Sequence, residues 1–177
     1  MQMQRPLLPV LLDEADRLES AWCHRASLWL SSPARRQFFV TVSRLGDGPF
    51  WYGLILLDAF LAPILAFQQM LAALVCTLLY KWLKHRTARE RPFVTHPGIP
   101  CHTPPLDRFS FPSGHSLHAV CLTLLTGLYQ PLALIILLPF AASVLVSRVV
   151  LGLHYPSDVA AGSMLGILIG WLVHLAV

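Results

Sequence analysis

The pattern of hydrophobic and polar positions divides the chain into a mixed N-terminal part and a long, mostly apolar remainder. The apolar runs cover residues 49–83, 113–130, 132–150 and 157–176. A membrane-spanning helix needs about 20 residues, so the first run is too long for one span and long enough for two short ones. We expect five spans, with the first turn between Pro63 and Gln69 and the turn after the third span at Tyr129.

Residues 10–44 combine charged and apolar positions, as amphipathic helices do. We expect one or two such helices, broken near Pro33. Trp22, Trp29 and the arginines suit a helix that lies in the membrane interface, and packing against the protein's own bundle is the alternative. The predicted fold is therefore an all-α polytopic membrane helix bundle with about five transmembrane helices. Residues 1–48 would form an amphipathic interfacial region and residues 49–177 the transmembrane bundle.

The composition favours a membrane protein. Of the 177 residues, 55% are hydrophobic and 12% are charged, whereas soluble domains have about 25% charged residues. The four cysteines lack the spacing of a disulfide framework or a zinc site. His96, Cys101 and His102 are likewise poorly spaced for a metal.

Two features outside the motifs carry predictions of their own. Prolines are so dense in residues 92–112 that a regular helix is excluded, and we expect a loop that covers the active site. Asp58 interrupts the first span, and we expect a buried acid that is hydrogen-bonded to a neighbouring helix. A proton or lipid-headgroup contact is the alternative for Asp58.

A cluster of reactive side chains lies at the junction of two apolar runs. Arg148, His154 and Asp158 fall within twelve residues there, and charged groups at membrane depth are costly unless they are paired or functional. Pro156 suits the first turn of a helix, which places Asp158 near a helix N-terminus. From there the carboxylate would accept the Nδ1 proton of His154 and leave Nε2 free to act.

Two further segments belong with this cluster. Lys84 precedes Arg91-Pro92 by seven residues, and Pro-Ser-Gly-His ends at His115. In this order the three segments resemble the signature of the type 2 phosphatidic acid phosphatase family, over roughly residues 44–176. Members of that family are integral-membrane lipid phosphatases that resemble vanadium haloperoxidases.

Residue chemistry at the second segment already favours phosphate binding. Ser113 is a good helix N-cap, Gly114 permits close approach of the backbone, and a helix N-terminus binds phosphate readily. The resemblance implies the roles of the other residues: His154 attacks phosphorus and forms a phosphohistidine, Asp158 orients it, and His115 protonates the leaving alkoxide and then helps to activate water. The phosphoryl group would be held by Lys84, Arg91, Ser113, Gly114 and Arg148. We expect no metal and no cofactor, because the cations already supply the charge. We expect His118 to pack beside the site or to support its residues from behind, and a catalytic role is the alternative.

The expected function is hydrolysis of a lipid phosphomonoester or diphosphate. The candidate substrates are polyprenyl diphosphate, phosphatidylglycerophosphate, phosphatidic acid and lipid A phosphate. The alternatives are a lipid-to-lipid phosphotransferase with the same phosphohistidine, a vanadate-dependent peroxidase, and a non-enzymatic lipid-binding or transport protein. The expected partners are the lipid phosphate substrate and membrane lipids, without nucleic acid, and the oligomeric state is left open.

We expect the protein in a bacterial inner membrane. With five spans, all 13 Lys and Arg residues fall on the face of the active site or at its edge. The positive-inside rule then places the active site on the cytoplasmic side. The periplasmic side is the alternative, because many bacterial proteins of the resembling family act on the outer side of that membrane.

Overall fold

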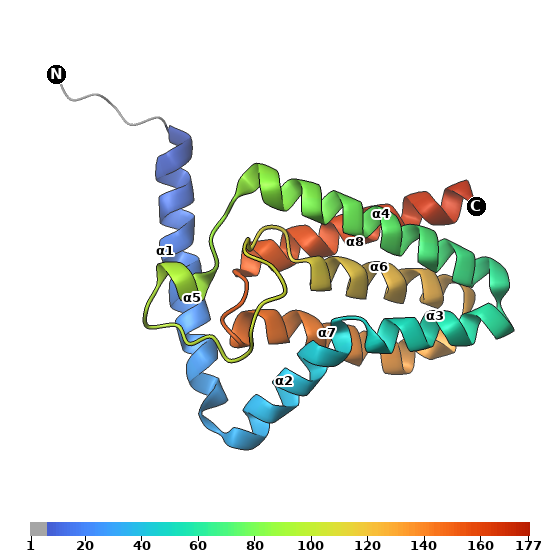
Figure 1. The fold of residues 1–177 in the computed structure, drawn as a ribbon, viewed down its shortest axis with the longest axis horizontal. Helices are drawn as coiled ribbons and strands as arrows, with labels where there is room; N and C mark the ends of the chain where they lie inside the picture. Colours follow the sequence, from blue (N-terminus) through green and yellow to red (C-terminus); the bar gives the residue numbers. More distant parts are fainter. Residues whose placement is uncertain (1–6) are drawn as a thin grey trace.

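The computed structural model describes residues 7–177, with side chains from residue 16 onward, and every regular element in that range is a helix. Figure 1 shows the helices of the bundle side by side, with α1 across one end and α2 leading back from it. The bundle helices are α3 (Pro49–Leu61), α4 (Pro63–Thr87), α6 (Gly114–Tyr129), α7 (Leu134–Val150) and α8 (Pro156–Ala176). The remaining helices are α1 (Leu7–Leu28), η1 (Trp29–Ser31), α2 (Pro33–Gly46), α5 (Pro92–Thr95) and η2 (Pro131–Ala133).

Three helical segments within the described residues are long and apolar enough to span a membrane: Pro63–Thr95, Pro131–Val150 and Pro156–Ala176. The apolar helix α3 is shorter, with 13 residues, or about 20 Å at the usual helical rise. Helix α6 has 16 residues and runs beside the long helices. The protein is therefore an integral membrane helix bundle, as the apolar runs predicted.

Helix α6 lies at the centre of the bundle. Leu117, Cys121 and Leu125 pack in one buried cluster with residues of α4 and α8. Ala119 and Leu122, from another side of the same helix, pack in a second cluster with residues of α3 and α7. A helix enclosed on several sides must be apolar around most of its circumference. This central position lets the first turn of α6 face the active-site cavity.

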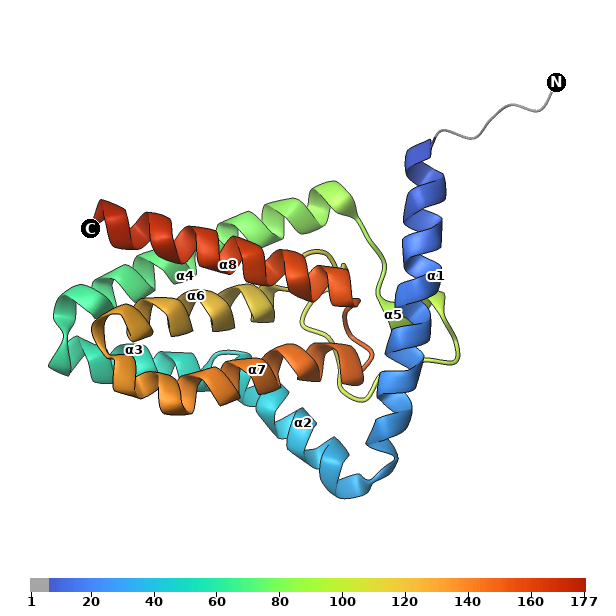
Figure 2. The ribbon, with the colours of Figure 1, turned by 180° about the vertical axis from the view of Figure 1, so that it is seen from behind.

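The closest packing joins α6 to α8, which lie side by side in both ribbon views (Figure 2). A Cβ atom at Gly162 would lie 2.5 Å from the carbonyl oxygen of Ser113, and one at Gly166 would lie 2.6 Å from that of Leu117. The glycines at four-residue spacing thus give α8 a small-residue face that lets α6 approach closely. Where α6 and α8 begin, the Ser113 N–H donates to the Asp158 carbonyl at 3.0 Å, and this hydrogen bond joins two of the signature segments.

The turn between the first two bundle helices lies at Ala62, directly before Pro63, so the predicted position between Pro63 and Gln69 is wrong. Proline lacks an N–H and has a preset φ, and it therefore starts α4. Gln69 is instead buried in α4, where its Nε2 donates to Asp58 Oδ2 at 2.7 Å. Asp58 also accepts from Gln130 at 3.0 Å, so it is a buried acid bonded to neighbouring helices, as expected.

The N-terminal helices break at Ser32-Pro33, as predicted. One side of this region packs on the bundle, with Cys23 and Leu30 buried. On the other side Trp22 and Trp29 are 69% and 49% exposed. The inner face therefore packs against the protein's own bundle, which was one of the two alternatives. The contact of the exposed outer face with lipid, the other alternative, stays a prediction. The division of the chain at residue 48 also stays a prediction.

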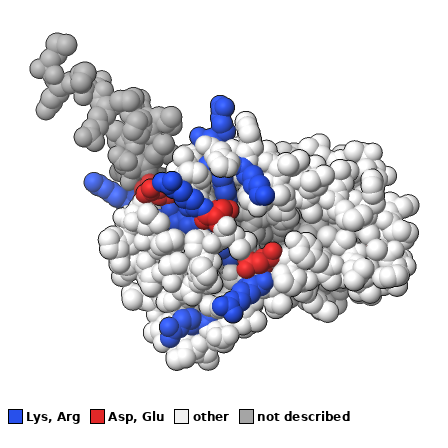
Figure 3. Space-filling model, in the orientation of Figure 1, with Lys and Arg blue, Asp and Glu red and all other residues white. Residues whose placement is uncertain are grey.

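Charged side chains are unevenly distributed on the surface. In Figure 3, Lys, Arg, Asp and Glu gather at the end of the molecule where α1 crosses the bundle, and the opposite end is uncharged on this face. The proline-rich loop, α5 included, lies at the same end (Figure 1). The charged end is therefore also the end where the signature segments meet.

Candidate active site

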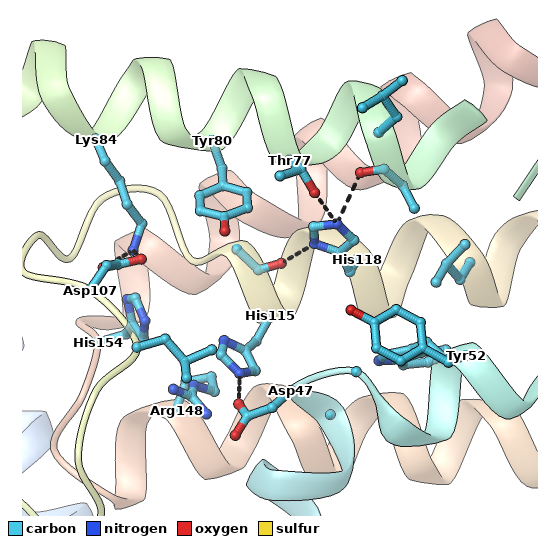
Figure 4. Close-up of a pocket in the computed structure, with 18 of the residues that line it drawn as sticks. Asp47, Tyr52, Thr77, Tyr80, Lys84, Asp107, His115, His118, Arg148 and His154 are labelled. Carbon is cyan, nitrogen blue, oxygen red and sulfur yellow. Dashed lines mark hydrogen bonds and ion pairs between the residues drawn. The ribbon is translucent and has the colours of Figure 1, made fainter. Parts of the chain in front are cut away.

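A cavity of about 380 Å³ opens at the charged end of the bundle, between the turn after α2 and helices α3, α4, α6 and α7 (Figure 4). Six of the predicted site residues line it: Lys84, Arg91, Gly114, His115, Arg148 and His154. The other two, Ser113 and Asp158, lie behind its wall and are fully buried. The structure therefore brings together all three segments that the sequence analysis singled out.

His154 is held in the wall of the cavity with 1% of its surface exposed. Its Nε2 lies 3.1 Å from Arg91 Nη1. Because arginine can only donate, Nε2 must accept this bond, and the ring proton of a neutral His154 then resides on Nδ1. Burial lowers the pKa of His154 well below its usual value, and the nearby Arg91 and Arg148 lower it further. The ring is thus neutral at pH 7, with its lone pair at Nε2.

The Nδ1 atom of His154 faces Asp158, at 3.5 Å from Oδ2. This distance is longer than a normal N–H···O hydrogen bond, and Nδ1 has no other partner among the described residues. The same Oδ2 accepts the backbone N–H of Tyr155 at 2.8 Å, and Oδ1 accepts from Arg89 at 2.8 Å. Asp158 is therefore fixed by two other donors while it faces the proton of the histidine.

Three buried cations surround the cavity: Lys84, Arg91 and Arg148. Lys84 Nζ also donates to the carbonyl of Phe109 at 2.8 Å, and Arg91 Nη1 to that of Leu153 at 2.7 Å. The side chain of Arg148 is held through a hydrogen bond to Ser43 of α2. Each cation is thus anchored by a neutral oxygen in the wall of the cavity.

Asp107, in the loop between α5 and α6, is a cavity residue that the sequence analysis missed. Its carboxylate accepts from Lys84 at 2.7 and 2.9 Å and from Arg91 at 2.7 Å. Burial raises its pKa, but the two cations outweigh burial and hold the pKa below the usual value. It is the only acidic residue in residues 92–112, and this isolated charge in the proline-rich loop could have indicated a role at the site. An ionised carboxylate is therefore paired with two of the cations that we expect to bind phosphate.

Asp47, in the turn between α2 and α3, is a second residue that was missed. Its carboxylate pairs with His115 Nε2 from the first turn of α6 (Figure 4). The turn depends on Gly48, whose φ of 150° favours glycine and whose added Cβ would lie 2.6 Å from the Tyr52 ring. The sequence Gly-Asp-Gly-Pro at residues 46–49 predicts a turn but no partner for Asp47. The Asp47 carboxylate accepts from His115 Nε2 and thereby fixes the orientation of the ring at the cavity.

The N-terminus of α6 completes the cavity wall. Ser113 caps the helix, with its Oγ accepting the Ser116 N–H at 3.3 Å. A Cβ atom at Gly114 would lie 3.3 Å from the Tyr80 ring, so the glycine keeps this wall open. His118, one turn later, donates from Nδ1 to the Gly114 carbonyl at 2.8 Å and also lines the cavity. Free N–H groups at such a helix end attract anions.

Within the part of the chain that the structure describes, no group of three or more His, Cys, Asp or Glu side chains is arranged to hold a metal ion. Cys101 is exposed, and its Sγ donates to the Thr103 carbonyl. The charges that face the cavity come from protein side chains.

The fold and this cavity define an integral membrane helix bundle whose central site combines two histidines with three cations. The chain belongs to the PAP2 superfamily, whose family model matches residues 65–177. The predicted family is thus confirmed. The matched region contains all three signature segments and excludes α1 and α2.

Several curated relatives of the chain are named as phosphatases. The decaprenylphosphoryl-5-phosphoribose phosphatase of Mycobacterium tuberculosis is 35% identical over 128 residues, which cover 70% of this chain and 69% of the relative. Phosphatidylglycerophosphatase B of Escherichia coli is 27% identical over 188 residues, which cover 83% and 73%. These relatives, together with the superfamily, support a lipid phosphatase activity for the chain.

Solved structures resemble the whole fold. The PAP2-type phosphatidylglycerolphosphate phosphatase of Bacillus subtilis matches with a TM-score of 0.75 and 27% identity, covering 94% of this chain and 86% of the other. LpxE of Aquifex aeolicus matches with a TM-score of 0.81 and 24% identity, covering 89% and 95%, and shows the fold alone.

Proposed function

We propose that this chain is a metal-independent lipid phosphate phosphatase that works through a phosphohistidine on His154. One observation carries the proposal: the Nε2 lone pair of His154, the His115–Asp47 pair and three buried cations line a single cavity. This set contains a nucleophile, an acid and a positively charged anion site. The superfamily and the phosphatase relatives support the same reaction class.

The substrate phosphate would bind between Lys84, Arg91 and Arg148 and the N-terminus of α6 at Ser113 and Gly114. Arginine can hold two phosphate oxygens at once, and lysine adds a point charge. Negative charge on the equatorial oxygens of the transition state would be stabilised by the same groups. The charge of the three cations is the reason for proposing that no metal ion is needed.

The first step breaks the bond between phosphorus and the leaving oxygen. Nε2 of His154 forms the new bond to phosphorus, after the entering phosphate has taken over its Arg91 partner. His115 gives its proton to the leaving alkoxide, and Asp158 stabilises the positive charge on the His154 ring. In the second step His115 removes a proton from water, whose oxygen attacks phosphorus and frees inorganic phosphate and His154.

A lipid substrate is supported by the inner part of the cavity. Trp51, Ile55, Leu74 and Leu122 line it beyond the histidines. Apolar walls next to a charged end fit a molecule with a phosphate and a hydrocarbon chain. The names of the relatives point to a phosphate on a polyprenyl-linked sugar or on phosphatidylglycerol, and we propose this substrate class.

The test is phosphate release by the purified chain from a lipid panel in detergent. The panel contains a polyprenyl diphosphate, a polyprenylphosphoryl-sugar phosphate, phosphatidylglycerophosphate, phosphatidic acid and lipid A phosphate. His154→Ala should lose turnover and keep the wild-type thermal unfolding, whereas the matched control His85→Ala, exposed at the end of α4, should retain activity. Release of phosphate by His154→Ala at the wild-type rate would refute the mechanism. A phosphorylated lipid acceptor as the product would indicate a phosphotransferase.

We also propose that the site faces the cytoplasm of a bacterial inner membrane, since the charged end of the molecule is the end of the cavity. Cys101 is exposed in the loop there, and Cys23, Cys76 and Cys121 are buried. With these three replaced by alanine, an impermeant maleimide should label Cys101 only after cell lysis. Labelling in intact cells would place the site on the periplasmic side.

A further inference from the structure

Arg89 lies outside the signature and outside the cavity, yet it binds four side chains directly behind the proposed nucleophile. Its Nη1 donates to Asp158 Oδ1 at 2.8 Å and to Ser157 Oγ at 2.6 Å. Its Nη2 donates to Glu19 Oε2 at 2.7 Å and to Asp16 Oδ1 at 2.5 Å. The planar guanidinium thus joins the start of α8 to helix α1 through fixed directions.

Helix α1 contacts the same segment through two further side chains. Glu19 Oε1 accepts the backbone N–H of Ser157 at 2.6 Å, which satisfies a free N–H at the start of α8. The Cys23 thiol lies 3.7 Å from the carbonyl oxygen of His154 and donates to it. Asp16, Glu19 and Cys23 are spaced by three and four residues, so they share one face of α1. This face lies against the His154–Asp158 segment.

The role of Arg89 follows from the position of Asp158. That carboxylate is fully buried, and its Oδ2 faces the Tyr155 N–H and His154 Nδ1. Its Oδ1 is the oxygen that Arg89 holds. A buried carboxylate without a cation is strongly disfavoured, and without Arg89 only the Tyr155 N–H would hold this one. Arg89 is itself stacked on the Tyr155 ring at 4.0 Å, so its fork has little freedom to turn.

We propose that Arg89 is a positioning residue for the phosphatase reaction. It keeps Asp158 charged and aimed at His154 Nδ1, and Asp16 and Glu19 of α1 keep Arg89 in place. Helix α1, which lies outside the matched residues 65–177, therefore helps to position the catalytic residues. This inference rests on the proposed function, because it assumes that His154 is the nucleophile.

The first experiment compares the steady-state kinetics of the purified full chain and its variants on the lipid of the panel that is hydrolysed fastest. Arg89→Ala should lower kcat about 10- to 100-fold, as loss of a residue that orients a functional histidine does, and should change KM less than about threefold. Arg89→Lys should recover part of kcat, since lysine restores the charge without the fork. The matched control Arg86→Ala, exposed in the last turn of α4, should stay within about twofold of wild type.

A double-mutant cycle separates positioning from a structural role. In the Asp158→Asn background, Arg89→Ala should cost less than about twofold in kcat, because the carboxylate that it orients is gone. Glu19→Gln should lower kcat on its own and have little further effect in the Arg89→Ala background. If Arg89 only fastens α1 to the bundle, its effect on kcat will multiply with that of Asp158→Asn, and the proposal is wrong.

Other outcomes are equally decisive. A raised KM with unchanged kcat in Arg89→Ala would mean that Arg89 binds phosphate, and would overturn the positioning role. If Arg89→Ala does not fold, Arg89→Lys and Glu19→Gln carry the same cycle with Asp158→Asn. A wild-type chain that hydrolyses no lipid of the panel, or an active His154→Ala, refutes the proposed function and this inference together. Loss of activity in His154→Ala with full kcat in Arg89→Ala refutes this inference alone.

Discussion

Substitution of Asp107 by asparagine should tighten binding of phosphate and of its analogues. The Asp107 carboxylate accepts hydrogen bonds from Lys84 and Arg91, two of the cations that we assign to the substrate phosphate. A phosphate that enters the cavity must therefore replace this carboxylate. Asparagine has the same shape and no charge, so Asp107→Asn removes the competitor with little change in packing.

The magnitude follows from the two ion pairs. The cations are almost completely buried, with 6% and 3% of their side chains exposed, whereas the Asp107 side chain is 36% exposed. Solvent screening at Asp107 reduces each pair to roughly 0.5–1 kcal/mol, the upper part of the range for exposed pairs. Together they amount to about 1–2 kcal/mol, or about 5- to 30-fold in an equilibrium constant.

The assay is the inhibition constant of vanadate and the KM of the lipid substrate, measured for wild type and Asp107→Asn. Both constants should fall about 5- to 30-fold in the variant. The lowered pKa of Asp107 keeps the competing carboxylate ionised from pH 7 down to pH 5, so the difference should persist across that range. Glu90→Gln, an exposed carboxylate outside the cavity, is the matched control and should change neither constant. A rise of either constant in Asp107→Asn would show that Asp107 arranges the cations for phosphate, and would refute the competition.

Three further predictions concern the metal, the helix packing and pH. Activity should survive EDTA, and vanadate should inhibit competitively; a requirement for added Mg²⁺ in the phosphate-release assay would contradict the assignment of charge to the side chains. Gly166→Ala should destabilise the protein by about 1–3 kcal/mol in thermal unfolding, because its Cβ would meet backbone, and Gly53→Ala, with open space around it, should not destabilise. The burial of His154 puts its folded pKa below the unfolded value of about 6.5. Unfolded chains therefore bind an extra proton as the pH falls below that value, and the melting temperature should drop from pH 7.5 to 5.5 less steeply in His154→Asn than in wild type.

The sequence by itself determined the parts of this protein that depend on local pattern. Apolar runs of a given length predict helices at membrane depth, and the proline at residue 33 predicts the break between α1 and α2. The spacing of Gly162 and Gly166 by four residues predicts a close helix contact, because both fall on one helix face. The order of the three signature segments identified the family and six of the residues that line the cavity. All these features are properties of a few neighbouring positions.

The tertiary structure alone decided which distant side chains meet these residues. Asp47 reaches His115 across 68 positions, and Arg89 reaches Asp16 across 73. Asp107 meets Lys84 only because the proline-rich loop folds back over the cavity. The direction of a side chain on a turn or loop is set by the packing of whole helices, and no local spacing encodes it. The position of the turn at Ala62 was mispredicted for a related reason. A polar residue such as Gln69 becomes buried when folding brings it a partner, here Asp58, and the local sequence does not reveal that partner.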